Sequence, residues 1–408
     1  MNEQWIRRSQ WIEQYAARFA SISFVREFVF PNPQYTKKQL QKEACDLLIA
    51  RRDRALVVQM KSQEDPAARD PAKLSGWIEK NARDAAQQLG GSLRTLNAAP
   101  FWCMHPRRGR VNFSPGEFTA LHGVVLIDCG IASMPLPADL PLSAHGVAVH
   151  YFDTNDFLNV VMQLRSFHDI ERYLAARAAL PDDVRRRLGS EKIILEYYML
   201  HDASFANWAT YEDASRAAAA EREDRDRLFH EKQARDKDAA FVEYIADTLA
   251  TRLPNYQDGL DADTLARFDA DENRQRYLVM QDILADLSLV ARRQLGRGLF
   301  EAFGPPIKHG KKKLVYRALY LDELPGFAFV ALSTEGYERQ QVIHCAFVLL
   351  GGALAHFEYS DGMVIADRDG DGFEIALVRG YTPTEADVRM GKERFGALRM
   401  EHRGEGLI

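Results

Sequence analysis

The stretch EACDLLIARRDRALVVQMK, residues 43–61, contains two short apolar runs, Leu47–Ala50 and Ala55–Val58. A charged tetrapeptide, residues 51–54, separates them. Short apolar runs joined by a polar loop are typical of the two strands of a β-hairpin. The stretch therefore predicts a hairpin with a charged turn.

The register of this hairpin brings three polar side chains together. Centring the turn between Arg52 and Asp53 places Asp46 opposite Gln59. Lys61 shares a face with Gln59 because side chains alternate along a strand with period two. A carboxylate, an amide and an ammonium group are thus expected to meet at one edge of an apolar sheet, which is the arrangement of a functional site.

Length and composition limit the classes of protein to consider. A chain of 408 residues is expected to form two or three domains, and 46% hydrophobic residues are ordinary for a globular protein. The net charge of −5 gives no overall positive field, so any site for a polyanion must be a local basic patch. The four cysteines form no CxxC pair, which favours free thiols. No apolar run approaches the roughly 20 residues of a membrane span, and the start of the chain is amphipathic and polar, so a cytoplasmic protein is expected.

The segments around the hairpin predict an alternation of helices and strands. We expect helices at 2–20, 77–96 and 157–164, strands at 21–30, 101–104, 111–113, 123–129 and 146–152, and a polar loop at 62–74. Asp153 and the polar residues after it supply the start of the third helix. The order α, β, β, β, α, β predicts an α/β (α+β) fold with a central mixed sheet flanked by helices.

The rest of the chain divides by composition. Residues 214–240 are almost wholly charged and alanine-rich, which indicates an exposed helix, and 241–253 and 274–303 are also expected to be helical. Strands are predicted at 314–321, 327–332, 342–350, 354–358, 362–366 and 373–379. Asp367 begins a loop that resembles a calcium site, but Val378 stands where a glutamate is needed, so a hairpin turn is the better interpretation. Three domains are predicted: 1–205, a helical connector 206–305, and an α+β domain 306–408.

Asp46 followed by Gln59-x-Lys61, after a helix and a strand and before a helix, resembles the PD-(D/E)XK nuclease superfamily. The resemblance covers residues 1–130, and extends to about 200. It implies a restriction-endonuclease-like fold and a Mg²⁺-dependent (or Mn²⁺-dependent) endonuclease that hydrolyses phosphodiester bonds, of DNA in preference to RNA, in restriction or anti-phage defence. Gln59 departs from the usual acidic residue, although restriction endonucleases of the Mrr type also carry a QxK version.

The resemblance also implies a role for each residue. Asp46 would be a direct metal ligand, Gln59 would offer its amide oxygen or position a water, and Lys61 would neutralise charge beside the scissile phosphate. Glu43 is the candidate for the missing carboxylate, provided that it lies in a turn or bulge before the strand, and Glu13 on the first helix is the alternative. The metal ligands are therefore predicted to be Asp46, Gln59 and Glu43.

Several alternatives remain open. The basic residues that are candidates to hold a phosphate backbone lie in predicted loops: Arg51, Arg52, Arg54, Arg107, Arg108, Arg110 and 311–313. Gln87 and Gln88, on the helix that follows the hairpin, are further candidates to face the site. The competing hypothesis is a catalytically inactive nuclease-like protein that binds nucleic acid or serves as a scaffold, with a protein partner on the C-terminal domain. No phosphate-binding P-loop, serine-hydrolase elbow or HExxH zinc motif is present in the sequence, and the oligomeric state is not predicted.

Overall fold

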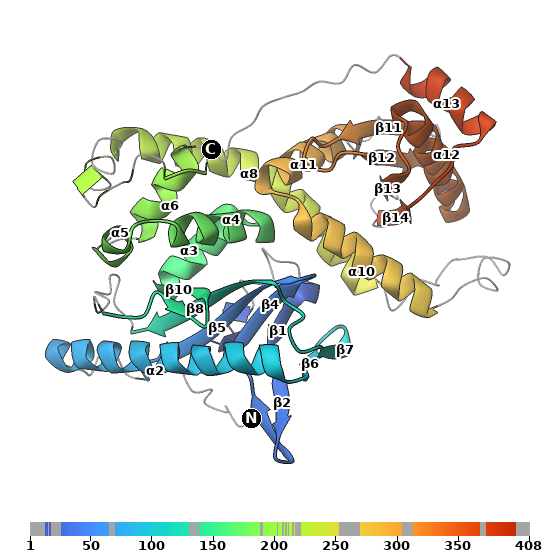
Figure 1. Ribbon diagram of the computed structural model, residues 1–408. Coiled ribbons are helices and arrows are strands. Elements are labelled where there is room, and N and C mark those ends of the chain that lie inside the picture. The colour runs from blue at the N-terminus through green and yellow to red at the C-terminus, as the bar shows by residue number, and fades with distance from the viewer. Residues whose placement is uncertain are drawn as a thin grey trace, which may run out of the picture. The chain divides into compact units, whose positions relative to one another are not determined.

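The computed structural model describes residues 13–14, 16–17, 26–64, 70–129, 137, 139–187, 191–201, 203–205, 208, 210, 212–213, 216, 222–252, 270–303, 313–367 and 373–396. The chain forms two compact units, one of residues 1–229 with 407–408 and the other of residues 230–406. Both combine helices with sheets, which confirms the predicted α+β class (Figure 1).

The first unit is built on a six-stranded sheet with the order β1-β4-β5-β8-β10-β9. β4 pairs antiparallel with β1 and β5, whereas β5, β8 and β10 run parallel. A mixed sheet was predicted, and it is confirmed. Its strands are β1 (Val29–Pro31), β4 (Leu47–Arg51), β5 (Arg54–Ser62), β8 (Ala120–Asp128), β9 (Ser143–Ala144) and β10 (Val147–Asp153).

The hairpin of β4 and β5 has the predicted register. Leu47 pairs with Val58 and Arg51 with Arg54, so the turn is centred between Arg52 and Asp53. Arg52 adopts a left-handed backbone conformation with φ of 52°, as two-residue hairpin turns require. Every residue of β4 is buried, because helices cover both faces of the sheet.

Helix α2 (Pro71–Ala98) covers one face of the sheet and connects the parallel strands β5 and β8. It begins six residues earlier than predicted, with Pro71 at a position where its missing N–H costs nothing, and Gly90-Gly91 do not interrupt it. Gly123 of β8 lets α2 approach closely, since a Cβ there would lie 2.7 Å from Cδ2 of Leu89. The apolar stripe on α2 is buried as predicted: Ala82, Ala85, Ala86, Leu89, Leu93 and Leu96.

The opposite face carries α3 (Thr154–Leu164), α4 (Phe167–Ala178), α5 (Asp182–Arg187) and α6 (Glu191–Leu200) (Figure 1). Asp153 caps α3 as predicted, accepting a hydrogen bond from the Asn155 N–H at 2.8 Å. Arg177 on α4 forms a buried ion pair with Glu191 at 3.1 Å, and Tyr173 also contacts Glu191. The unit is therefore an α/β/α sandwich.

The start of the chain differs in part from expectation. Residues 26–28 form a short 3-10 helix, η1 (Arg26–Phe28), so only β1 remains of the strand predicted at 21–30. Residues 13–14 and 16–17 are helical, as predicted, and the other residues of 2–25 lie outside the described part of the chain.

A second, four-stranded sheet has the order β3-β2-β6-β7. Its strands are β2 (Gln34–Lys37), β3 (Leu40–Glu43), β6 (Phe101–His105) and β7 (Gly109–Phe113), of which β6 and β7 were predicted. The β2–β3 hairpin was not predicted, because its turn residues are Lys38 and Gln39, with φ of 50° and 66°, in place of the usual glycine or asparagine. β2 pairs with β6, so two hairpins from separate places in the chain form one sheet.

The second unit contains α8 from residue 230 onward, α10, α11 and a sheet of order β11-β12-β13-β14. The strands predicted at 342–350 and 354–358 are wrong, because this segment is helix α12, which connects the parallel strands β12 and β13. The bounds are α8 (Arg222–Arg252), α10 (Ala270–Asp286), α11 (Leu289–Phe303), β11 (Lys313–Tyr320), β12 (Phe327–Glu335), α12 (Arg339–Phe357), β13 (Asp361–Asp367), β14 (Phe373–Val378) and α13 (Glu385–Phe395).

Helix α12 is the one described helix that is long and apolar enough to cross a membrane. It packs instead on β12, β13 and α13, with Leu350 and Leu354 fully buried. Gly351 and Gly352 lie against Asp387 and Met390 of α13, closer than side chains there would allow. α12 is therefore a core helix of the second unit. The Asp/Gly turn between β13 and β14, residues 368–372, lies outside the described part of the chain.

Candidate functional site

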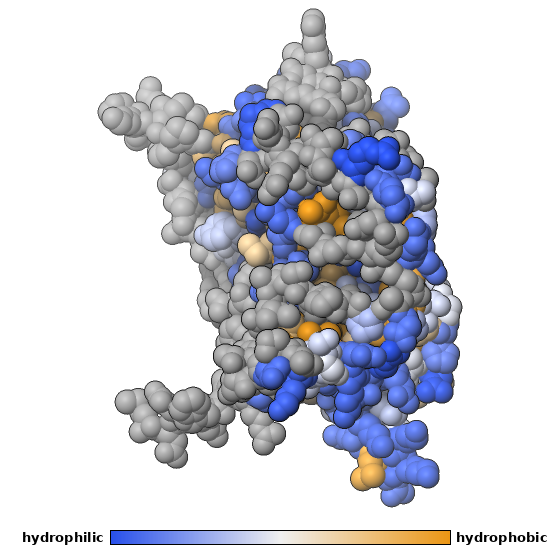
Figure 2. All heavy atoms as spheres, turned by 90° about the vertical axis from the view of Figure 1, so that its left-hand side faces the viewer, coloured by the Kyte–Doolittle hydropathy of each residue, from blue (hydrophilic) through white to orange (hydrophobic). Residues whose placement is uncertain are grey.

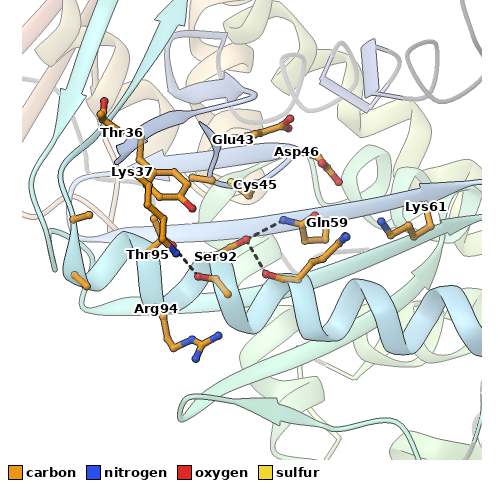
Figure 3. A pocket seen from close by; sticks show the side chains of 16 residues that line it. Thr36, Lys37, Glu43, Cys45, Asp46, Gln59, Lys61, Ser92, Arg94 and Thr95 are labelled. Atoms are coloured by element: carbon orange, nitrogen blue, oxygen red, sulfur yellow. Dashed lines mark hydrogen bonds between the residues drawn. The ribbon is translucent and has the colours of Figure 1, made fainter. Parts of the chain in front are cut away.

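A pocket of about 850 Å³ lies where the two hairpins β2–β3 and β4–β5 meet the C-terminal half of α2 (Figure 3). Asp46, Gln59 and Lys61 all line it, together with Glu43 and Gln88. The three side chains that the hairpin register was expected to bring together therefore face one cavity.

Asp46 is half-buried in the short break between β3 and β4. Its Oδ2 accepts a hydrogen bond of 2.5 Å from the backbone N–H of Met60, across the hairpin. Burial raises the pKa of this carboxyl group, opposed by the Met60 hydrogen bond and by the positive charge of Lys61. The carboxylate is thus held in a fixed orientation by the neighbouring strand.

Gln59 is buried on β5, with 6% of its surface exposed. Its Nε2 donates to Oγ of Ser92 on α2 at 2.9 Å, and that hydroxyl donates to the backbone oxygen of Gln88 at 3.0 Å (Figure 3). Because this bond turns the amide nitrogen toward α2, the amide oxygen is the end of Gln59 that accepts a ligand, and it has no hydrogen-bond donor among the described residues. Ser92 was not predicted, since its contact with Gln59 depends on how α2 packs on the sheet.

Lys61 is half-buried on the same strand face as Gln59. Its ammonium group forms neither an ion pair nor a hydrogen bond with any residue that the structure describes. A cation in this position, which interacts with Asp46 only beyond ion-pair distance, is suited to bind an anionic group that enters the pocket.

Glu43 and Glu13 both lie within electrostatic reach of Asp46. Glu43 is the last residue of β3, so it occupies a separate strand and not the turn or bulge that was expected. Burial, followed by the charges of Asp46 and Glu13, raises its pKa to about 7, and the protonated carboxyl donates to Asp46. Burial and the charge of Asp46 also raise the pKa of Glu13, against a hydrogen bond from Asn32.

The oxygen atoms that line the pocket are of the kind that bind a hard cation such as Mg²⁺. Carboxylate oxygens of Asp46 and Glu43 and the amide oxygen of Gln59 line the pocket, and Mg²⁺ is bound in proteins by one or two carboxylates with other oxygens. No three His, Cys, Asp or Glu side chains of the described residues are placed as a complete metal site. Cys45, also in the pocket wall, is a neutral buried thiol, because burial raises its pKa.

The basic residues expected to hold phosphate mostly have partners inside the protein. Arg51 is buried with 1% exposure, which excludes it from a surface patch. Arg54 pairs with Glu171 at 2.6 Å, and Arg107 pairs with Glu27 at 3.2 Å.

Of the three remaining arginines expected to bind phosphate, Arg52 is exposed in the β4–β5 turn, whereas Arg108 lies over the ring of Phe30 and Arg110 over that of Trp102. Besides Lys61, the pocket is lined by two cations that were not predicted, Lys37 and Arg94. The basic run KKQLQK, residues 37–42, was the available signal. Residues 311–312 lie outside the described chain, and Gln88 lines the pocket whereas Gln87 does not.

Comparison of the chain with protein-family models, with curated proteins and with solved structures found no match. The function of the pocket therefore rests on the chemistry and placement of its own residues.

Proposed function

We propose that the chain is a metal-dependent nuclease that hydrolyses phosphodiester bonds, with DNA as its substrate, in the cytoplasm. One observation carries the proposal: Asp46, Gln59 and the unpaired Lys61 line one pocket with the carboxyl group of Glu43. Oxygen donors beside an unpaired ammonium group are what a cation and a phosphate need when they bind together.

The order of elements supports the same function. The helical residues before β1, then β1, β4, β5, α2 and β8, follow the order α, β, β, β, α, β. Asp46 precedes the second of these strands and Gln59-x-Lys61 ends the third, which matches the layout that the resemblance to PD-(D/E)XK nucleases implies. The β2–β3 and β6–β7 hairpins are additions to this order.

Each side chain has a distinct task in the proposed reaction. Asp46, Glu43 and Gln59 would hold the cation, which supplies positive charge for the phosphate oxygens. Lys61 binds a nonbridging phosphate oxygen and stabilises the charge that develops as water adds to phosphorus and the ester bond breaks. Ser92 acts through Gln59, because its hydroxyl keeps the amide oxygen directed away from the helix.

A second candidate is a nuclease-like protein that binds nucleic acid without cutting it. Gln59 supplies no negative charge, and Glu43, with a pKa of about 7, is about half protonated at neutral pH, so the pocket is less anionic than a site with three carboxylates. Both features weaken cation binding and favour this alternative over catalysis. A role in restriction or anti-phage defence fits either candidate.

The test is cleavage of plasmid DNA, linear DNA and RNA with Mg²⁺ or Mn²⁺. Asp46→Asn keeps an acceptor for the Met60 N–H, and Lys61→Met keeps the length of the side chain, so both variants are expected to fold. We expect wild type and the control Lys73→Ala, a change at an exposed residue near the start of α2, to cleave, and the two site variants to lose at least about 100-fold in rate.

Three outcomes are informative. Equal cleavage by all four proteins excludes the site. Loss of cleavage in the two site variants alone, with unchanged melting temperatures, supports it. A wild-type protein that binds DNA but cuts none of the substrates with either metal supports the binding protein in its place.

A further inference from the structure

The β2–β3 hairpin projects from the body of the first unit (Figure 1). Residues 36–43 are all exposed, and Leu40 next to the turn exposes 64% of its surface. Figure 2 shows the same projection at the lower edge as a mainly hydrophilic surface. A two-stranded ribbon with so little packing of its own is suited to contact another molecule.

The charge on this ribbon is positive and without internal partners. Lys37, Lys38 and Lys42 are exposed, and Lys37 lines the pocket together with Arg94 of α2. None of these four side chains forms an ion pair or a hydrogen bond with a residue in the described part of the chain. The chain as a whole carries a net charge of −5, so this is a local basic patch that adjoins the candidate site.

The pairing of the ribbon fixes which side chains share a face. Lys37 pairs with Leu40 and Tyr35 with Lys42, so these four lie on one face. Gln41 lies on the other face, and Gln39 is in the turn. The end of the ribbon thus combines lysines for phosphates with amide and apolar side chains, which are groups that contact base edges.

We propose that the β2–β3 ribbon enters the major groove of duplex DNA and directs the phosphate backbone to the pocket, an inference that rests on the proposed nuclease function. The major groove of B-form DNA is about 12 Å wide and admits a two-stranded ribbon, whereas the minor groove is only about 6 Å wide. The major groove of duplex RNA is deep and narrow. The ribbon therefore selects duplex DNA.

The experiment measures binding in EDTA, so that it does not depend on cleavage. Fluorescein-labelled duplex DNA, duplex RNA and single-stranded DNA of one sequence are titrated with the full chain over a range of salt concentrations. The test variant is Lys37→Ala/Lys38→Ala/Lys42→Ala. The matched control, Lys73→Ala/Lys80→Ala/Lys237→Ala, removes the same charge from exposed positions outside the pocket and the ribbon.

We expect the wild type and the control to bind duplex DNA more tightly than the other two nucleic acids. The test variant should lose roughly ten- to a hundredfold in affinity at 0.15 M salt, and the slope of log K against log salt should become shallower by about 3, since each phosphate contact contributes about 0.9. Equal affinity and slope for the two triple variants, tighter binding of RNA or of single strands, or no binding by wild type would each overturn the inference.

Failure of this inference is distinct from failure of the nuclease proposal. If the chain binds duplex DNA through the ribbon but never cuts it, the ribbon inference stands and the nuclease proposal fails. If cleavage depends on Lys61 while both triple variants bind and cut alike, the nuclease proposal stands and the ribbon inference fails.

Discussion

Replacing Glu43 with glutamine should stabilise the protein at high pH in the absence of metal. Burial and the neighbouring carboxylates raise the pKa of Glu43 in the folded state to about 7 from an ordinary 4.5, so the folded protein favours the protonated form. The contribution of Glu43 to the stability of the protein is fully present below pH 4.5 and is lost as the pH rises through 7. The reason is that the folded state then has to release a proton that it holds more tightly than the unfolded chain does. Glutamine cannot ionise and avoids this loss.

The size of the effect follows from the same pKa values. The difference between about 7 and 4.5, at about 1.4 kcal/mol per pKa unit, corresponds to roughly 3.5 kcal/mol for a fully buried group. Glu43 is only partly buried, however, so solvent screens much of this interaction, and we expect about 1 kcal/mol above pH 7. For a unit of this size that is a rise of roughly 2–4 °C in melting temperature.

The assay is differential scanning calorimetry of Glu43→Gln and wild type in EDTA at pH 4, 6 and 8. Asp84→Asn, which removes an exposed carboxylate from the solvent side of α2, is the control. The gain should be absent at pH 4, partial at pH 6 and full at pH 8. Mg²⁺ should stabilise wild type at pH 8 more than the variant, because the cation binds the carboxylate form. A gain that does not change with pH, or none at pH 8, would refute the raised pKa of Glu43 in the folded protein.

Three further predictions concern the site and its support. Gln59→Glu adds a negative charge beside Asp46, so it should lower the melting temperature in EDTA and raise the affinity for Mn²⁺, measured by calorimetric titration, by about tenfold; unchanged affinity would argue against a metal pocket. Gly123→Ala should cost about 1–3 kcal/mol in urea unfolding, because its Cβ would lie 2.7 Å from Leu89, and combining it with Leu89→Ala should cost less than the sum of the two single changes. Glu191→Gln removes the ion-pair partner of the buried Arg177 guanidinium and should cost about 3–5 kcal/mol, so a melting temperature like that of wild type would contradict the buried pair.

The register of the β4–β5 hairpin could be predicted because two local rules decide it. The charged turn is short, and the alternation of side chains then fixes which residues share a face. This was enough to place Gln59 and Lys61 on one wall of the pocket with Asp46. The position of Glu43 could not be predicted in the same way, because it belongs to a strand in another sheet whose pairing depends on residues far away in the chain.

Two elements were missed for opposite reasons. The β2–β3 turn uses Lys38 and Gln39, which rarely adopt positive φ, so the sequence contains no turn signal there. In α12 the pair Gly351-Gly352 looks like a turn between two apolar strands, but the glycines instead allow α13 to pack closely on the helix. Local patterns do not show whether a glycine serves a bend or a close approach between helices.

The pairing of β2 with β6 links two additions to the central αβββαβ order. Residues 34–43 and 101–113 are separated in the chain, yet Gln34 lies beside Trp102 and Tyr35 beside Phe101 in one sheet. Replacing either hairpin alone would leave the other with an unpaired strand edge, which invites aggregation. In a chimera, the ribbon and its supporting hairpin would have to be exchanged together, as a single cassette encoded in two separate pieces.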